Sequence, residues 1–256
     1  MITSVHNPKI QLVRTLLRHS QERREARAFV AEGVRLVEEA LAADWPFRLV
    51  LFGETLSERG RDLVEELEAR SIEIEKVTDA LLNSISETEN SQGILAVLDY
   101  SQFPIPHLLS FVLILDSIRD PGNLGTLLRT AAAAGVQAVF LPPETADAFA
   151  PKVVRGGMGA HFRLPILSLT WDEIRTRTSG LEVFLADMEG EVACWEANFR
   201  LPLALIVGGE AAGASAAARE LANQRVYIPM PGGSESLNAS VAGGVLIFEI
   251  VRQRKM

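Results

Sequence analysis

The sequence is poor in the residues that build covalent cross-links and metal sites. Its single cysteine, Cys194, excludes an internal disulfide framework and fits a reducing compartment. The four histidines are spread along the chain without the pairwise spacing that metal ligands show. We therefore expect no metal site, and we interpret Cys194 as a small buried apolar residue.

Long apolar runs are also missing. No stretch approaches the roughly 20 apolar residues that are needed to cross a bilayer. The N-terminal segment MITSVHNPKIQ lacks the apolar core of a signal peptide. These two absences predict a cytoplasmic protein with no membrane partner.

Basic residues are scarce overall but not evenly scattered. The net charge of −8 argues mildly against a nucleic-acid partner. Residues 1–35, however, carry seven basic side chains against three acidic ones. We predict that the basic stretch of residues 9–35, together with Arg129 and Arg155, forms a local RNA-facing strip, although solvated helix faces would show the same charges. The residues we assign to RNA contact are Lys9, Arg23, Arg24, Arg27 and Arg155.

Apolar strand segments alternate with amphipathic helical segments along the whole chain. Residues 8–27 have the apolar spacing of one polar helix, and the alternation that follows ends near Tyr100. The proline-containing segment SQFPIPH then reads as a linker, and a second alternation begins at FVLILD. We predict an α/β chain with domains at 1–100 and 109–256 joined by a linker at 101–108. The buried strands of the second domain imply a parallel sheet that is covered on both faces.

Three strand ends in the second domain carry unusual loops. Ligands of parallel α/β sheets bind outside the carboxyl ends of the strands. In the first loop, LDSIRDPGNLGTLLRTAAAAG, a strand stops at Asp116, Asn123 can cap the next helix, and Arg129 lies on that otherwise apolar helix. An ordinary surface arginine beside a helix cap would give the same pattern.

The second loop, LIVGGEAAGAS, lacks the features of the common nucleotide-binding loops. A G-x-G-x-x-G fingerprint would need glycine at Glu210, which speaks against a dinucleotide-dependent enzyme. No Gly-Lys-Ser/Thr follows, so the segment is not a Walker loop either. Gly208 and Gly209 still permit close approach of backbone to a ligand, and Glu210 can bind an arginine or a ribose hydroxyl. A tight turn with a solvent-facing glutamate is the open alternative.

The third loop, IPMPGGSESLNASVAGG, has more polar groups than a helix cap requires. Ser236 and Asn238 precede the last helix, and Leu237 lies between them. This composition indicates hydrogen-bonding groups and an apolar wall around a planar ring, with a plain capped turn as the alternative.

Together these stretches resemble the SpoU or TrmH-like branch of the SPOUT RNA ribose 2′-O-methyltransferases. The resemblance rests on three motifs in order, DPGNLGTLLRTA, GGEAAG and IPMPGGSESLNASVA, and extends over nearly the whole chain. The N-terminal segments ITSVHNPKIQLVRTLL and FVAEGVRLVEEAL look like the small substrate-binding domain of that family, which has an L30e-like fold.

The resemblance implies a trefoil-knotted C-terminal SPOUT domain, bound S-adenosylmethionine and a homodimer. It implies catalytic roles for Asn123, Arg129, Glu210, Ser236 and Asn238, and cofactor contacts from Gly208, Gly209, Ile228, Met230, Leu237 and Asn238. The expected activity is methylation of a ribose 2′-hydroxyl in structured RNA, with ribosomal RNA favoured over transfer RNA. A catalytically silent RNA-binding protein of the same fold is the alternative.

Overall fold

The chain forms two compact units, which are described separately. The computed structural model describes residues 1–88, 91–100, 105–209 and 213–255. Unit 1 comprises Met1–Gln102 and Phe149–Phe162, and unit 2 comprises Phe103–Ala148 and Arg163–Met256. The segment Phe149–Phe162, which the sequence interpretation left within the second domain, therefore packs with the N-terminal residues. In the described part of the chain, no helix is long and apolar enough to span a membrane.

Unit 1 is built on a four-stranded mixed sheet in the order β1-β4-β2-β3. Its strands are β1 (Ala28–Glu32), β2 (Phe47–Phe52), β3 (Ile74–Lys76) and β4 (Ile94–Asp99). Strand β4 pairs antiparallel with both β1 and β2, whereas β2 and β3 are parallel.

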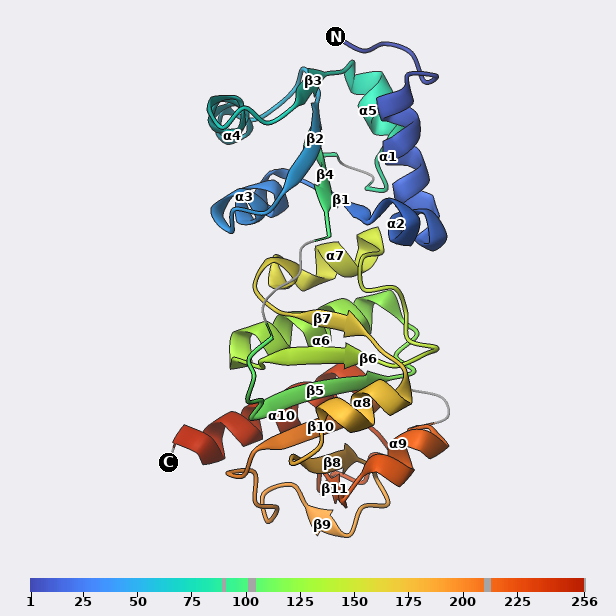
Figure 1. Cartoon of the computed structure of the whole chain (residues 1–256), viewed down its shortest axis with the longest axis vertical. Helices are drawn as coiled ribbons and strands as arrows, with labels where there is room; N and C mark the ends of the chain where they lie inside the picture. Colours follow the sequence, from blue (N-terminus) through green and yellow to red (C-terminus); the bar gives the residue numbers. More distant parts are fainter. Residues whose placement is uncertain (89–90, 101–104, 210–212, 256) are drawn as a thin grey trace. The chain divides into compact units, whose positions relative to one another are not determined.

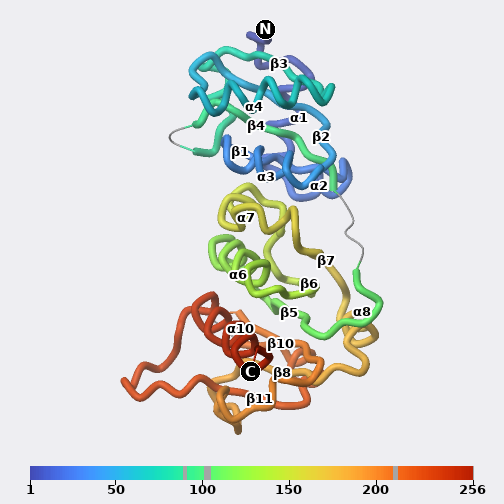
Figure 2. Tube along the Cα trace, turned by 90° about the vertical axis from the view of Figure 1, so that its left-hand side faces the viewer, coloured from blue at the N-terminus to red at the C-terminus, as the bar shows by residue number. Residues whose placement is uncertain are grey.

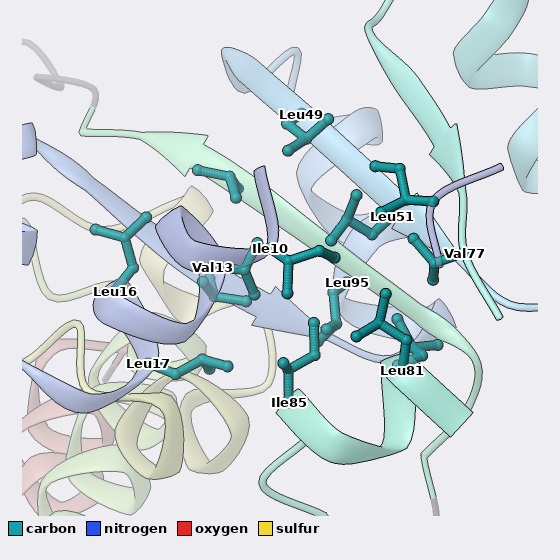
Figure 3. Close-up of a cluster of buried hydrophobic side chains, with 14 of the residues drawn as sticks. Ile10, Val13, Leu16, Leu17, Leu49, Leu51, Val77, Leu81, Ile85 and Leu95 are labelled. Carbon is teal, nitrogen blue, oxygen red and sulfur yellow. The ribbon is translucent and has the colours of Figure 1, made fainter. Parts of the chain in front are cut away.

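The helices of unit 1 lie on both faces of this sheet. On one face, α1 (Pro8–Arg18) and α5 (Asp79–Ile85) pack against alternate residues of β1, β2 and β4. Figure 3 shows Ile10, Val13 and Leu16 of α1 pointing into this cluster, opposite Leu95. Figure 1 shows α3 (Val34–Ala42) and α4 (Glu58–Ala69) on the other side of β2 and β4.

The helix expected over residues 8–27 is two helices, so that prediction was wrong. Helix α2 (Ser20–Ala26) follows α1 after His19, whose backbone is extended. The Nη1 atom of Arg23 donates to the carbonyl oxygens of Leu16 and Leu17, at 2.6 and 3.3 Å. Because the last carbonyls of a helix have no partner within it, this arginine satisfies the end of α1 and makes the break stable.

Aromatic rings hold Phe149–Phe162 to unit 1. This segment forms α7 (Pro151–Gly157) and the short helix η1 (Ala160–Phe162). The Phe149 ring stacks on Tyr100 with centroids 4.2 Å apart and lies 5.0 Å from the ring of Phe29 on β1. Phe29 lies on the strand face opposite to Val30, so the segment packs over β1 on the side of the sheet that faces away from α1 and α5.

Unit 2 contains a seven-stranded parallel sheet in the order β7-β6-β5-β10-β8-β11-β9. The strands are β5 (Phe111–Asp116), β6 (Ala138–Leu141), β7 (Ile166–Ser168), β8 (Glu182–Ala186), β9 (Val192–Ala193), β10 (Leu203–Gly208) and β11 (Gln224–Tyr227). The predicted parallel sheet is confirmed.

Helices cover both faces of this sheet, as the apolar strands require. In Figure 1, α8 (Trp171–Arg177) and α9 (Ala216–Leu221) lie in front of the strands, with α6 (Pro121–Ala134) and α10 (Ala239–Lys255) behind. A Cβ atom on Gly243 of α10 would come within 2.4 Å of Leu127 on α6. The two helices are therefore in direct contact, and the trace in Figure 2 shows them on the same side of β5 and β10.

Candidate functional site

The carboxyl ends of β8, β10 and β11 surround one pocket in unit 2. Its volume is about 640 Å³, which lies within the usual range for small-molecule sites. The described residues that line it are Ala186, Asp187, Met188, Glu189, Val207, Gly208, Gly209, Gly213, Ala214, Arg219, Val226, Tyr227, Ile228, Met230, Ser236, Leu237, Asn238, Ala239, Ala242 and Leu246. The second and third predicted loops therefore meet at the same cavity.

The second loop approaches its neighbours so closely that side chains would not fit. A Cβ atom on Gly209 would lie 2.4 Å from the backbone oxygen of Ser117, and one on Gly208 would lie 2.7 Å from the backbone nitrogen of Ala214. The Asp116 carboxylate, which is 1% exposed, accepts a hydrogen bond of 2.6 Å from the backbone N–H of Ser215. The first and second loops are thus packed together at the ends of β5 and β10.

Asn238 connects the third loop to the first. Its Nδ2 donates to Oδ1 of Asn123 at 3.1 Å. Its Oδ1 accepts from the Ser240 N–H at 2.9 Å and the Ser240 hydroxyl at 2.7 Å, and so caps the start of α10. Two of the predicted catalytic residues, far apart in sequence, are therefore in direct contact beside the pocket.

Asn123 is not the cap of its own helix, so that interpretation of its side chain was wrong. Asp120 is the N-cap of α6, and its side chain accepts from the Asn123 N–H at 2.8 Å. Pro121 occupies the first helical position, which proline favours because its missing N–H would have no partner there. Because Asp120 caps the helix, the side-chain amide of Asn123 is available to bond to Asn238.

Arg129 lies on α6 outside the set of residues that line the pocket. Its side chain is exposed, and among the described residues it forms no ion pair. A charged group on this helix is therefore available to solvent or to an added ligand. Glu210, the remaining predicted catalytic residue, lies outside the described residues.

The predicted cofactor contacts from the third loop border the pocket. Ile228, Met230 and Leu237 give it an apolar side, and Ser236 adds a hydroxyl at the rim. Leu237 is 38% exposed, so it has apolar surface left to cover.

Sequence reasoning missed the contribution of β8. Asp187, Met188 and Glu189 follow this strand and line the pocket, as does Arg219 of α9. The rule that ligands bind at the carboxyl ends of parallel strands applies equally to β8. The residues that directly follow β8 include no paired glycines, so their composition did not indicate a ligand-binding loop.

The structure separates the residues that were predicted to bind RNA. Arg23 is 4% exposed and its guanidinium is bonded to backbone carbonyls, so it does not belong to a surface strip. Lys9 forms ion pairs with Glu73 and Glu75, which raise the pKa of its ammonium group through these hydrogen bonds.

Arg155 is also committed to contacts within unit 1. It lies 3.4 Å from the buried carboxylate of Glu32 and 3.9 Å from the exposed carboxylate of Glu87. Arg24 and Arg27 have exposed side chains, as the predicted strip requires.

Cys194 follows the edge strand β9 and is 1% exposed. Burial is the main reason that the pKa of its thiol lies above the ordinary value. A buried thiol with a raised pKa is a poor nucleophile, which agrees with the interpretation of Cys194 as an apolar core residue.

Comparison with known proteins finds matching families over both units. Residues 110–248 match the SpoU rRNA Methylase family, and residues 7–96 match the MRM3-like substrate binding domain.

Curated relatives match over nearly their full length. The chain is 35% identical to an uncharacterized tRNA/rRNA methyltransferase of Synechocystis, covering 99% of this chain and 94% of the relative. It is 33% identical to the 23S rRNA (guanosine(2553)-2′-O)-methyltransferase RlmP of Bacillus subtilis, covering 97% and 98%. Among solved structures, the AdoMet-bound rRNA methyltransferase of Sinorhizobium meliloti superposes with a TM-score of 0.86 at 31% identity, covering 98% and 97%.

Proposed function

The chain belongs to the SpoU rRNA methylase family, and from that premise we propose that it methylates a ribose 2′-hydroxyl of ribosomal RNA with S-adenosylmethionine as the methyl donor. The observation that carries the proposal is the side-chain hydrogen bond between Asn123 of the first motif and Asn238 of the third, because it brings the two motifs together beside the pocket. The nearly full-length match to a 23S rRNA 2′-O-methyltransferase favours ribosomal over transfer RNA.

The residues that line the pocket fit an adenosyl cofactor. Ile228, Met230 and Leu237 provide apolar surface, while Gly208 and Gly209 expose backbone at the end of β10. Planar rings bind between apolar side chains, with a few polar groups to orient them. S-adenosylmethionine supplies an electrophilic methyl group that is carried on a sulfonium.

In this proposal Arg129 stabilises charge at the ribose. A guanidinium has a pKa above about 12, which makes it a poor base, but it binds phosphate and a developing alkoxide well. Its exposed side chain is consistent with a partner that arrives with the RNA. Asn123 and Glu210 orient Arg129 and the ribose, and Ser236 and Asn238 shape the pocket wall.

A filter-binding assay of methyl transfer tests the activity and the role of Arg129. We expect transfer of tritiated methyl groups to ribosomal RNA by the wild-type chain and none by Arg129→Ala. Cofactor affinity, measured by calorimetry, should stay within about threefold, since Arg129 is outside the pocket lining. A variant that loses cofactor binding together with activity contradicts this role. Binding of RNA without any methyl transfer by the wild type would instead favour the silent RNA-binding alternative.

We assign RNA contact in unit 1 to Arg24 and Arg27, two exposed members of the predicted strip. Replacing both with glutamate should weaken RNA binding and lower its dependence on salt, because fewer counterions are released. The matched control is Arg59→Glu, an exposed arginine that pairs with Glu38 on α3. Equal RNA affinity of all three proteins would remove the strip from the proposal.

The knot, the homodimer and the cytoplasmic location complete the proposal. Strand β10 follows β9 in sequence yet lies between β5 and β8, an order that is compatible with a knotted chain. Helix α10 exposes Val241, Val245 and Phe248 along one side, which supports a second copy of the chain as its cover. The 23S ribosomal RNA that is the substrate of the Bacillus subtilis relative supports a cytoplasmic location for this protein.

A further inference from the structure

The charged side chains of the pocket gather on one side of it. Among the described residues that line it, only Asp187, Glu189 and Arg219 carry charge. Asp187 and Glu189 follow β8, and Arg219 comes from α9. In the strand order β5-β10-β8-β11, the end of β8 is separated by β10 from the end of β5, which precedes Asn123.

Asp187 is held firmly in the turn after β8. Its backbone N–H donates to the carbonyl of Val226 at 3.0 Å, and its carbonyl accepts from the Gly190 N–H at 3.0 Å. Its Oδ1 accepts from the Glu189 N–H at 3.1 Å, and the side chain is 10% exposed. A carboxylate fixed by several bonds can orient a cation beside it.

That cation is Arg219. Its Nη1 donates to Oδ2 of Asp187 at 2.5 Å. A guanidinium has five N–H donors, so the bond to Asp187 leaves others for a ligand. Gly213 lies next to the Arg219 guanidinium. A Cβ atom built on Gly213 would lie 3.6 Å from Nη2 of Arg219, which is an ordinary van der Waals distance. The Arg219 side chain is 43% exposed, and the space beside it belongs to the pocket.

We propose that Arg219 binds the carboxylate at the amino-acid end of the cofactor, and that Asp187 is a positioning residue that fixes the guanidinium for this contact. This inference rests on the proposed function. The adenosyl part of the cofactor carries no negative charge, so the carboxylate is its one anionic group. Arg219 is the one cationic side chain among the described pocket residues, and guanidinium–carboxylate pairs are strong and geometrically specific.

Two ligands that differ only in the amino-acid end test the assignment by calorimetry. S-adenosylhomocysteine has this end, whereas 5′-methylthioadenosine lacks it, and both are thioethers. Arg219→Met should weaken S-adenosylhomocysteine by about tenfold to a hundredfold, as expected for a lost charge-assisted bond. The affinity for 5′-methylthioadenosine should stay within about twofold, because that ligand has no carboxylate to lose.

Arg225→Met is the matched control. Arg225 also approaches the Asp187 carboxylate, at 3.9 Å, but it does not line the pocket. Both ligands should bind this variant as they bind the wild type. A second variant, Arg219→Lys, should recover part of the lost S-adenosylhomocysteine affinity, since it keeps a point charge without the planar fork.

The following results would contradict the assignment of Arg219 to the cofactor carboxylate. Equal losses for both ligands in Arg219→Met would mean that the residue only supports the fold of the pocket. Weaker RNA binding with unchanged S-adenosylhomocysteine affinity would assign Arg219 to an RNA phosphate. If the wild-type chain binds neither S-adenosylhomocysteine nor S-adenosylmethionine, the proposed function fails as well. If it binds them and Arg219→Met binds S-adenosylhomocysteine equally well, the assignment of Arg219 alone fails.

Discussion

The side-chain amide of Asn238 uses its oxygen and its nitrogen on two different helices. The oxygen caps α10 through the backbone of Ser240, and the nitrogen bonds to Asn123 of α6. These two tasks respond differently to substitution, because aspartate retains the oxygen but not the donor, and alanine retains neither. The effects of this residue on stability and on catalysis can therefore be separated.

We expect Asn238→Ala to lower the free energy of unfolding by about 1–2 kcal/mol through loss of the cap. Asn238→Asp should stay within about 0.5 kcal/mol of the wild type, because a carboxylate is favourable at a helix N-terminus. It would also place a negative charge beside Asn123 and the pocket, so single-turnover methyl transfer should fall at least about tenfold. Urea unfolding and rapid-quench assays measure the two effects.

Ser234→Ala is the control for this pair, since Ser234 lies in the same loop with an exposed side chain. It should change neither the free energy of unfolding nor the rate. An Asn238→Asp variant as active as the wild type would show that the bond to Asn123 does not matter for the reaction.

Single residues also show where sequence reasoning works and where it stops. The resemblance of the three motifs to the family pointed to the glycines and asparagines that the structure brings together beside the pocket. The cap of α6 was also within reach, because Asp120 directly precedes a proline and proline favours the first helical position. The burial of Arg23 could not be predicted, because its guanidinium bonds to backbone carbonyls that lack a partner only where α1 ends.

At the scale of elements, long apolar strands were easier to predict than short strands at the edge of the parallel sheet. Strands β5 and β10 are six-residue apolar runs with clear ends. Strands β7 and β9 have three and two residues, too few to show any periodicity. The position of α7 in unit 1 depends on contacts with β1 and Tyr100, and no local pattern in PKVVRGG encodes them.

Arg155 of α7 pairs with Glu32 of β1, and we predict that this ion pair stabilises unit 1. The Glu32 carboxylate is 3% exposed and accepts from the hydroxyl groups of Ser86 and Thr88, with Arg155 as its cationic neighbour. Arg155→Ala removes the compensating charge from a buried anion. We expect unit 1 to lose about 1–3 kcal/mol of stability.

Hydrogen exchange of the β1 amides measures this loss, since exchange reports local opening. Arg119→Ala is the control, because Arg119 and its partner Glu144 have 73% and 66% exposed side chains, and such surface pairs contribute about 0–1 kcal/mol. Unchanged exchange in Arg155→Ala would mean that the aromatic contacts alone hold the segment.

At the scale of the whole molecule, the apolar character of α10 on several sides needs an explanation. Leu246, Ile247 and Ile250 are buried, yet Val241, Val245 and Phe248 are 51%, 43% and 50% exposed. The spacing of the exposed residues, four and then three positions apart, places them on one stripe of the helix. A helix that is apolar on nearly all sides is usually buried, and the described residues of unit 2 leave this stripe exposed. A second copy that covers it would also approach α6, which packs against α10 and carries Arg129.

The last prediction follows from this stripe. Phe248→Glu would place a charge at the centre of the proposed contact, and an unpaired carboxylate between apolar surfaces costs several kcal/mol. We expect the wild type to sediment as a dimer at micromolar concentration and Phe248→Glu to sediment as a monomer, with methyl transfer lost at the same concentration. Leu108→Glu, at a residue 88% exposed outside α10, should leave both properties unchanged. A monomeric wild type with full activity would contradict the dimer, and it would require Arg129 to reach the ribose at the pocket of its own chain.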